Sequence, residues 1–246
     1  MDTAAVEERI AEPSPRSLAR MAGACQLIEA LTATFGQVIV LNRLAVDGNA
    51  AATAANIVGH ERLFWAGFAS SLIGVVFHVA WAFLLYDLFK YVNRRISLFA
   101  TFVILVGCAV QALAIVFYIT PLFVLAGSSS FSAFTTDQLQ GLAFLLLRLN
   151  GSAFNIYLVF FGLWCVLTGF LIFRSSFLPR VLGVLLAISG SAWMMYLWPP
   201  LANRLFMPYI AGASALGEIP LELWLLVMAV NAQRWKEQAL AAVVEK

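Results

Sequence analysis

The chain has 246 residues, of which 62% are hydrophobic and 11% charged, and its formal net charge is +2. A soluble domain of this length carries far more charged surface, and neither the net charge nor a basic stripe points to a nucleic-acid partner. Apolar stretches of about 20 residues recur, each long enough to cross the hydrocarbon core of a bilayer. The composition therefore predicts an all-α fold, a polytopic transmembrane helix bundle.

The opening run MDTAAVEERIAEPSPRS mixes acids, bases and prolines, unlike the cleanly basic start of a cleavable signal peptide. We expect a cytoplasmic tail over 1–17, a transmembrane domain over 18–233 and a second cytoplasmic tail over 234–246. The apolar runs predict six spans, near 18–42, 63–89, 96–126, 152–173, 180–198 and 209–233.

The basic residues predict the orientation of these spans. Six spans place both tails and the second and fourth loops on one side of the membrane. The Lys and Arg residues of that side are Arg9, Arg16, Arg20, Lys90, Arg94, Arg95, Arg174, Arg180, Arg234, Lys236 and Lys246, against Arg43, Arg62 and Arg204 on the other. Basic residues gather in cytoplasmic loops, so both termini are predicted to be cytoplasmic.

The outer loops are predicted to hold short interfacial helices. DGNAAATAANIVGHE, residues 47 to 61, reads as one, with Ala54, Ile57 and Val58 on a shared face. TTDQ fits a capping box that starts another helix at Thr135. One helix from there to residue 173 would be about 57 Å long, too long for a single crossing. We therefore expect a bend or break at Asn150-Gly151-Ser152.

Several polar side chains fall inside the apolar spans. Glu29, His78 and Glu222 each lie about 11 residues from the cytoplasmic end of a span, at one depth near the bilayer centre. Gln111 sits at a similar level, and Glu218 is one turn from Glu222. Polar groups at this depth are costly unless they face the bundle interior. We predict that His78 faces Glu29 or Glu222.

Three functions fit such a polar interior, and the residues leave them open. The cluster can lock helix register in a structural or partner-binding subunit, or a titratable histidine beside carboxylates can handle protons or a small solute. A metal-dependent membrane enzyme is the third. His78, Glu29 and Glu222 are its ligand candidates, although no HxxxH or HExxH spacing supports a metal site. No GxSxG motif is present, and no catalytic residue or cofactor is predicted.

Other polar residues receive secondary assignments. Gln26 and Gln37 share a face with Glu29, while Arg148 either pairs with Glu218 or extends to the lipid headgroups. Asn155 is predicted to bond between helices. The run of Lys90, Arg94 and Arg95 is a topological signal that can also bind anionic lipid at the cytoplasmic face. The three cysteines fall in apolar segments and are interpreted as small apolar residues.

Five stretches carry a family resemblance: DGNAAATAANIVGHERLFWAGF, AFLLYDLFKYVNRR, QLQGLAFLLLRLN, FFGLWCVLTGFLIFRSSFLPRVLGVLLAISG and GEIPLELWLLV. In order and spacing the chain resembles the bacterial multi-pass membrane family known as domain of unknown function 4386. The resemblance implies a polytopic protein of the bacterial inner (plasma) membrane whose activity is not established. It also implies an acidic residue in the second span, where this chain has Ser71 or His78, and it favours Glu218 as a shared residue.

The leading interpretation is an integral membrane protein that handles protons or a small solute of unknown identity. Glu29, His78, Glu218 and Glu222 would line its interior.

Overall fold

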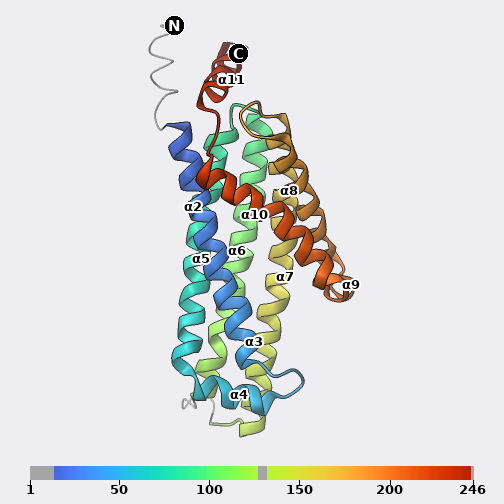
Figure 1. Cartoon of the computed structure of the whole chain (residues 1–246). Helices are drawn as coiled ribbons and strands as arrows, with labels where there is room; N and C mark the ends of the chain where they lie inside the picture. The colour runs from blue at the N-terminus through green and yellow to red at the C-terminus, as the bar shows by residue number, and fades with distance from the viewer. Residues whose placement is uncertain (1–13, 127–131, 245–246) are drawn as a thin grey trace. The chain divides into compact units, whose positions relative to one another are not determined.

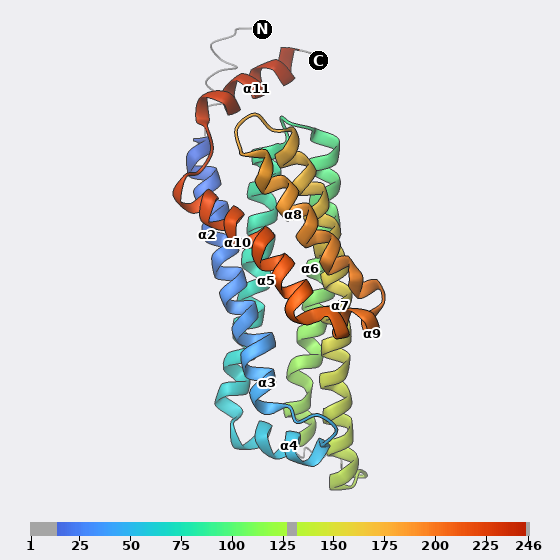
Figure 2. The same cartoon turned by 45° about the vertical axis from the view of Figure 1, so that its right-hand side comes forward.

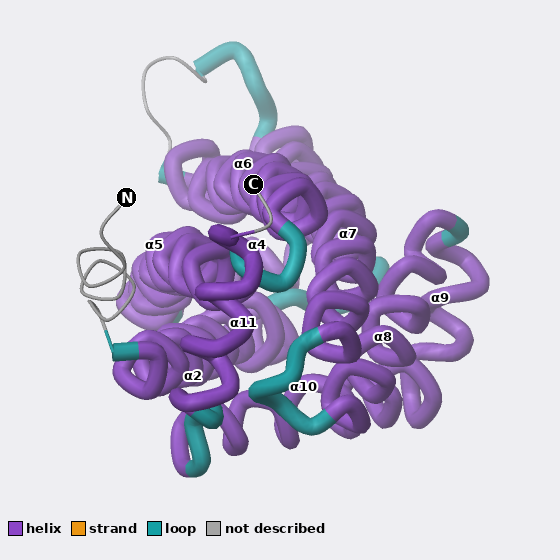
Figure 3. Tube along the Cα trace, turned by 90° about the horizontal axis from the view of Figure 1, so that it is seen from above, coloured by secondary structure: helices purple, strands orange, loops and turns teal. Residues whose placement is uncertain are grey.

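The computed structural model describes residues 14–126 and 132–244, and every regular element there is a helix. Figure 3 shows helices joined by short loops, and Figure 1 labels them along the chain. Six helical segments are long and apolar enough to span a membrane: Pro15–Leu44, Glu61–Phe89, Arg94–Leu125, Thr136–Arg174, Arg180–Leu197 and Pro208–Val227. The predicted number of spans and the all-α class are confirmed.

The first span is built from three consecutive helical pieces. Helix α2 (Pro15–Ala33) runs into a π-helical stretch, η1 (Thr34–Val40), and then into α3 (Leu41–Leu44). A π-helical stretch widens the backbone locally and frequently marks a functional or tightly packed position. Here it carries Gly36, at which an added Cβ would collide with the Ser71 hydroxyl and the Gly67 carbonyl. The missing side chain lets the first span pack closely on the second.

The middle spans are single unbroken helices: α5 (Glu61–Phe89), α6 (Arg94–Leu125) and α7 (Thr136–Arg174). Of the bend or break predicted at residues 150–152, the break is wrong, because α7 is one helix of 39 residues that continues through this position. An asparagine ends a helix when its amide bonds to its own backbone. The Asn150 amide instead donates to the Ala114 carbonyl of α6 at 2.8 Å, so nothing terminates α7 there.

The predicted capping box and interfacial helix are both present. The Gln138 backbone NH donates to Thr135 Oγ1 at 3.3 Å, and Gln138 Oε1 accepts from the Thr135 NH at 2.9 Å. Helix α4 (Ala50–Gly59) runs across the direction of α5 in Figures 1 and 2. Its inner face differs from the prediction: Ile57 is fully buried, but Val58 is 57% exposed.

The last third of the chain holds α8 (Arg180–Trp193), η3 (Met194–Leu197), α9 (Pro199–Leu205), η4 (Phe206–Ile210), α10 (Ala211–Val227) and α11 (Ala232–Val244). The sixth span ends earlier than predicted. Ala229 adopts a left-handed φ of 56° just after α10, which an α-helix cannot contain. The chain then turns into α11, where Trp235 Nε1 donates to the Leu88 carbonyl at 2.9 Å. The second predicted tail is therefore largely a docked helix.

The contacts divide the chain into two compact units. Unit 1 comprises Met1–Leu27, His78–Gly107 and Leu158–Lys246, and unit 2 comprises Ile28–Phe77 and Cys108–Tyr157. Helices α2, α5, α6 and α7 each contribute residues to both.

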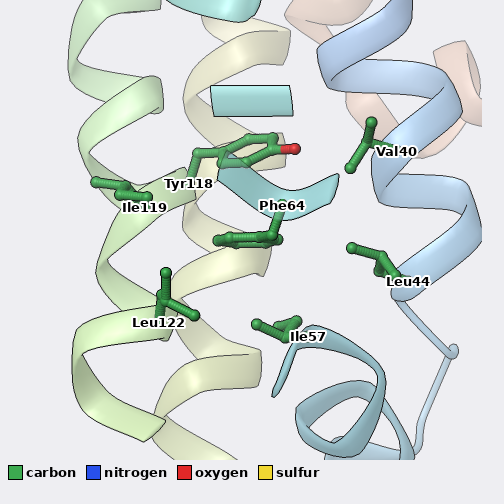
Figure 4. Packing of buried hydrophobic residues seen from close by; sticks show 7 residues of the cluster. All are labelled: Val40, Leu44, Ile57, Phe64, Tyr118, Ile119 and Leu122. Carbon is green, nitrogen blue, oxygen red and sulfur yellow. The ribbon is translucent and has the colours of Figure 1, made fainter. Parts of the chain in front are cut away.

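Unit 2 has an apolar core around one aromatic pair. Phe64 of α5 and Tyr118 of α6 lie with ring centroids 4.8 Å apart. Figure 4 shows the residues that surround this pair: Val40, Leu44, Ile57, Ile119 and Leu122. The Tyr118 hydroxyl donates to the Gly36 carbonyl at 3.3 Å, which gives this buried polar atom a partner.

In unit 1, glycines bring the backbones of α7 and α8 together at two levels. A Cβ on Gly169 would lie 2.5 Å from the Gly183 carbonyl oxygen, and one on Gly162 would lie 2.5 Å from the Gly190 carbonyl oxygen. Each pair joins one residue of α7 to one residue of α8. The two pairs are separated by seven residues along each of these antiparallel helices. Small residues at such contacts allow the close approach that drives helix association in membranes.

This packing predicts opposite effects for one substitution at two positions of α7. Gly169→Ala places a methyl group against backbone and lowers the free energy of unfolding by about 1–3 kcal/mol. Gly151→Ala meets nothing within 4 Å and raises it by about 0.5–1 kcal/mol, because alanine favours the helix. Thermal unfolding in detergent measures both, and equal melting temperatures for the two variants would contradict the close packing.

Candidate functional site

His78 belongs to unit 1 and is completely buried. Helix α5 positions it one turn before Trp81, and the two rings have centroids 5.1 Å apart. Phe161 of α7 lies edge-on to His78 at 5.8 Å, and Trp81 contacts Trp164 of α7 at 4.5 Å. An imidazole that the sequence places inside an apolar run is therefore packed among aromatic rings.

Four of the predicted site residues belong to unit 1: Gln26, His78, Glu218 and Glu222. Gln26 is 4% exposed and Glu222 is 7% exposed, so both side chains are buried. The pairing of His78 with Glu29 or Glu222 stays a prediction. Of these four residues, His78 on α5 and Glu222 on α10 are buried titratable side chains, and Gln26 on α2 is a buried amide.

Glu218 is half-buried and is held by two donors. Its Oε1 accepts from Ser189 Oγ at 2.6 Å and from Trp193 Nε1 at 2.7 Å, both on α8. Such lengths are typical of bonds to an ionised carboxylate. The Trp193 ring lies 6.4 Å from Phe161, whose ring also contacts His78. Glu218 is therefore joined through Trp193 to the aromatic cluster around His78.

Unit 2 contains Glu29 and Gln111, which are 8% and 1% exposed. Gln111 lies one turn from Cys108 on α6, and the Cys108 thiol is within electrostatic range of the Glu29 carboxylate. Glu29 of α2 and Gln111 of α6 are thus two buried polar side chains of unit 2.

The secondary candidates of unit 2 have simpler roles. Gln37 Nε2 donates to Ser71 Oγ at 3.4 Å, so it links the first two spans. Arg148 is exposed, and its ion pair is with Asp47 at 3.1 Å, a partner that sequence reasoning did not name. Asn155 is half-buried.

Asn150 and Trp81 are buried polar residues that the sequence reasoning missed. Asn150, fully buried on α7, was assigned to a helix break, although an asparagine inside a long apolar run is itself a sign of a buried polar contact. Trp81 was missed because tryptophan inside a span reads as apolar. Its Nε1 is buried without a hydrogen-bond partner among the described residues, and the same holds for Gln26 Oε1, Gln111 Oε1 and Asn150 Oδ1.

The buried polar atoms of both units determine which ligands the interior can bind. A buried donor or acceptor without a protein partner usually binds an ordered water molecule. Both units hold such atoms and at least one buried titratable side chain. Within the described residues, no three or more His, Cys, Asp or Glu side chains are grouped so that they could hold a metal ion.

The family model described as Domain of unknown function (DUF4386) covers residues 21–229, and the chain belongs to this family. Neither the curated proteins nor the solved structures gave a match.

The Glu218 contacts predict a graded loss of stability. Glu218→Gln keeps an oxygen that can accept from Ser189 and Trp193, whereas Glu218→Leu leaves both donors without that acceptor. Each unsatisfied buried donor costs about 1–3 kcal/mol, so Glu218→Leu lowers the melting temperature clearly more than Glu218→Gln. Thermal unfolding followed by tryptophan fluorescence measures the difference. An equal loss in the two variants would show that the hydrogen bonds do not stabilise the fold.

Proposed function

We propose that this member of the DUF4386 family is a proton-handling protein of the bacterial inner membrane, with both termini in the cytoplasm. Its protons are exchanged at buried titratable side chains, His78 and Glu222 in unit 1 and Glu29 in unit 2. The single observation that carries the proposal is the complete burial of His78, an imidazole in the middle of a transmembrane helix.

The energetic cost of this placement supports a functional role. An ionisable side chain inside the membrane is expensive, and it marks a proton or solute pathway more often than a surface residue does. Histidine is the side chain whose charge changes most readily near neutral pH. The buried Trp81 Nε1 and Gln26 Oε1 of the same unit provide places where internal water can bind and carry protons.

The aromatic packing favours protons over a larger solute. Trp81 and Phe161 approach His78 with ring centroids 5.1 and 5.8 Å away, and Trp164 packs on Trp81. A solute would have to displace these rings to reach the imidazole. A proton needs only a chain of hydrogen bonds.

The membrane and its sidedness rest on charge and on the family resemblance. One side holds most of the basic residues. Several of them lie at or next to helix ends on that side: Arg16, Lys90, Arg174, Arg180 and Arg234. This excess supports a cytoplasmic location for both termini. The bacterial inner membrane follows from the resemblance described above.

The same aromatic packing supports a second candidate, a structural membrane subunit whose polar groups only fix helix register. In that case His78 is a packing residue between Trp81 and Phe161. The two candidates differ in whether removal of the imidazole changes proton flux or only stability.

A proton-flux assay tests the proposal. The full chain is reconstituted in vesicles of phosphatidylethanolamine and phosphatidylglycerol that contain a pH-sensitive dye, and a potassium diffusion potential is applied. We expect the wild-type protein to raise proton entry above that of empty vesicles. His78→Gln, which keeps hydrogen-bonding groups but removes the titratable one, should reduce this entry by at least about tenfold.

The chain offers a matched control, because His60 is its only other histidine. His60 is exposed at the end of α4, where its Nδ1 lies 3.0 Å from the Asn56 carbonyl. His60→Gln should leave proton entry unchanged. Proton handling would be contradicted if proton entry with the wild-type protein equalled that of empty vesicles, or if it were equal for wild type and His78→Gln. A large loss of melting temperature in His78→Gln together with wild-type flux would support the structural candidate.

A further inference from the structure

A hollow in unit 1 combines two arginines with an apolar wall. It has a volume of about 370 Å³ and lies where α2 starts, α10 ends and α11 starts, beside the loop from Ser175 to Pro179. Figures 1 and 2 both show these three helix ends close together. We propose that this hollow binds the phosphodiester of an anionic phospholipid between Arg16 and Arg234.

The two guanidinium groups come from opposite ends of the chain. Arg16 is in the first turn of α2, and Arg234 is in the first turn of α11. Among the described residues, neither lies within salt-bridge distance of a carboxylate. Two cations without an acidic partner in one hollow form a site for an anion, and guanidinium matches the geometry of phosphate oxygens.

Hydrogen bonds hold the Arg234 side of the hollow in place. Arg234 Nη1 donates to the Ser176 carbonyl at 3.4 Å, which uses only one of its five donors. The Ser176 backbone NH and hydroxyl both donate to Gln238 Oε1, at 3.1 and 3.0 Å. The Asn231 NH donates to the Phe177 carbonyl at 3.2 Å. The start of α11 is thus tied to the loop, and Arg234 is oriented before any ligand arrives.

The wall of the hollow indicates a lipid rather than a free anion. Trp224 and Met228 line it together with Phe177 and Leu178, and the Met228 side chain is 62% exposed. Tryptophan is enriched where a membrane protein meets the headgroup region. Basic pockets between transmembrane helices on the cytoplasmic side are typical binding places for anionic lipid headgroups. The arginines would hold the phosphate while the apolar wall contacts the glycerol and the upper acyl chain.

Two neighbouring hollows are weaker candidates for the same ligand. One, of about 440 Å³, shares Ser176 and Arg234 with the proposed site but also contains the Glu237 carboxylate, which would repel a phosphate. The other, of about 490 Å³, is lined by Lys90 and Arg94. There the Lys90 ammonium is already bound to Asp87 at 2.7 Å. The lipid contact predicted for the run Lys90, Arg94 and Arg95 is therefore less favourable than one at Arg16 and Arg234.

This inference is independent of proton handling, and lipid titration tests it. The full chain in a neutral detergent is titrated with phosphatidylglycerol or phosphatidylcholine, and bound lipid is counted by native mass spectrometry. We expect phosphatidylglycerol to bind about tenfold more tightly than phosphatidylcholine, and Arg16→Gln/Arg234→Gln to abolish the preference. The matched control, Arg94→Gln/Arg95→Gln, removes the same charge from the same side and should keep it.

A second measurement keeps the test valid if the Arg16→Gln/Arg234→Gln variant does not fold. Brominated phosphatidylglycerol should quench tryptophan fluorescence in the wild type, and Trp224→Phe should reduce this quenching. Three results would overturn the proposal: no preference for phosphatidylglycerol in the wild type, equal loss in the control variant, or quenching that is unchanged in Trp224→Phe. Displacement of the lipid by inorganic phosphate at similar concentration would also overturn it, in favour of a soluble phosphate site.

Discussion

The structure depends on one constraint: hydrocarbon offers no hydrogen bonds, so each polar group inside a span must find its partner within the protein or in internal water. Several groups meet this condition directly. Tyr118 donates to the Gly36 carbonyl, Asn150 to the Ala114 carbonyl, and Ser189 and Trp193 to Glu218. These bonds join different spans, so the polar groups also determine which helix faces pack together.

Close backbone approach makes these contacts possible. Gly36 lets the first span reach Ser71 and Gly67 on α5, and the pairs Gly162–Gly190 and Gly169–Gly183 do the same for α7 and α8. Lipid gives no hydrophobic force between helices, so association relies on such van der Waals contact and on hydrogen bonds. Glycines at the contacts and polar residues beside them therefore act together in each unit.

The sequence was sufficient to predict the features that depend on local pattern. Apolar length predicts the six spans, and the Thr135–Gln138 spacing predicts the capping box that the hydrogen bonds confirm.

Features set by distant partners were not predictable. The continuity of α7 depends on Asn150 reaching Ala114, and the docking of α11 depends on Trp235 reaching Leu88. An interior position is what the sequence predicts for His78, Glu222, Glu29 and Gln111, because polar groups at one depth share the same need to avoid lipid. The contacts among these residues could not be predicted, since the rotation of each helix about its own axis is determined only by packing.

The central claim is that the buried His78 imidazole exchanges protons with bulk water. Magic-angle-spinning NMR of protein labelled with ¹⁵N-histidine in lipid bilayers tests it most directly, because the only two histidines give two sets of signals. The exposed His60 serves as the internal reference for contact with the solvent. The account predicts that the His78 signals change reversibly when the pH of the sample is changed. His78 signals that stay constant when the pH is changed would contradict it and leave the imidazole as a packing residue.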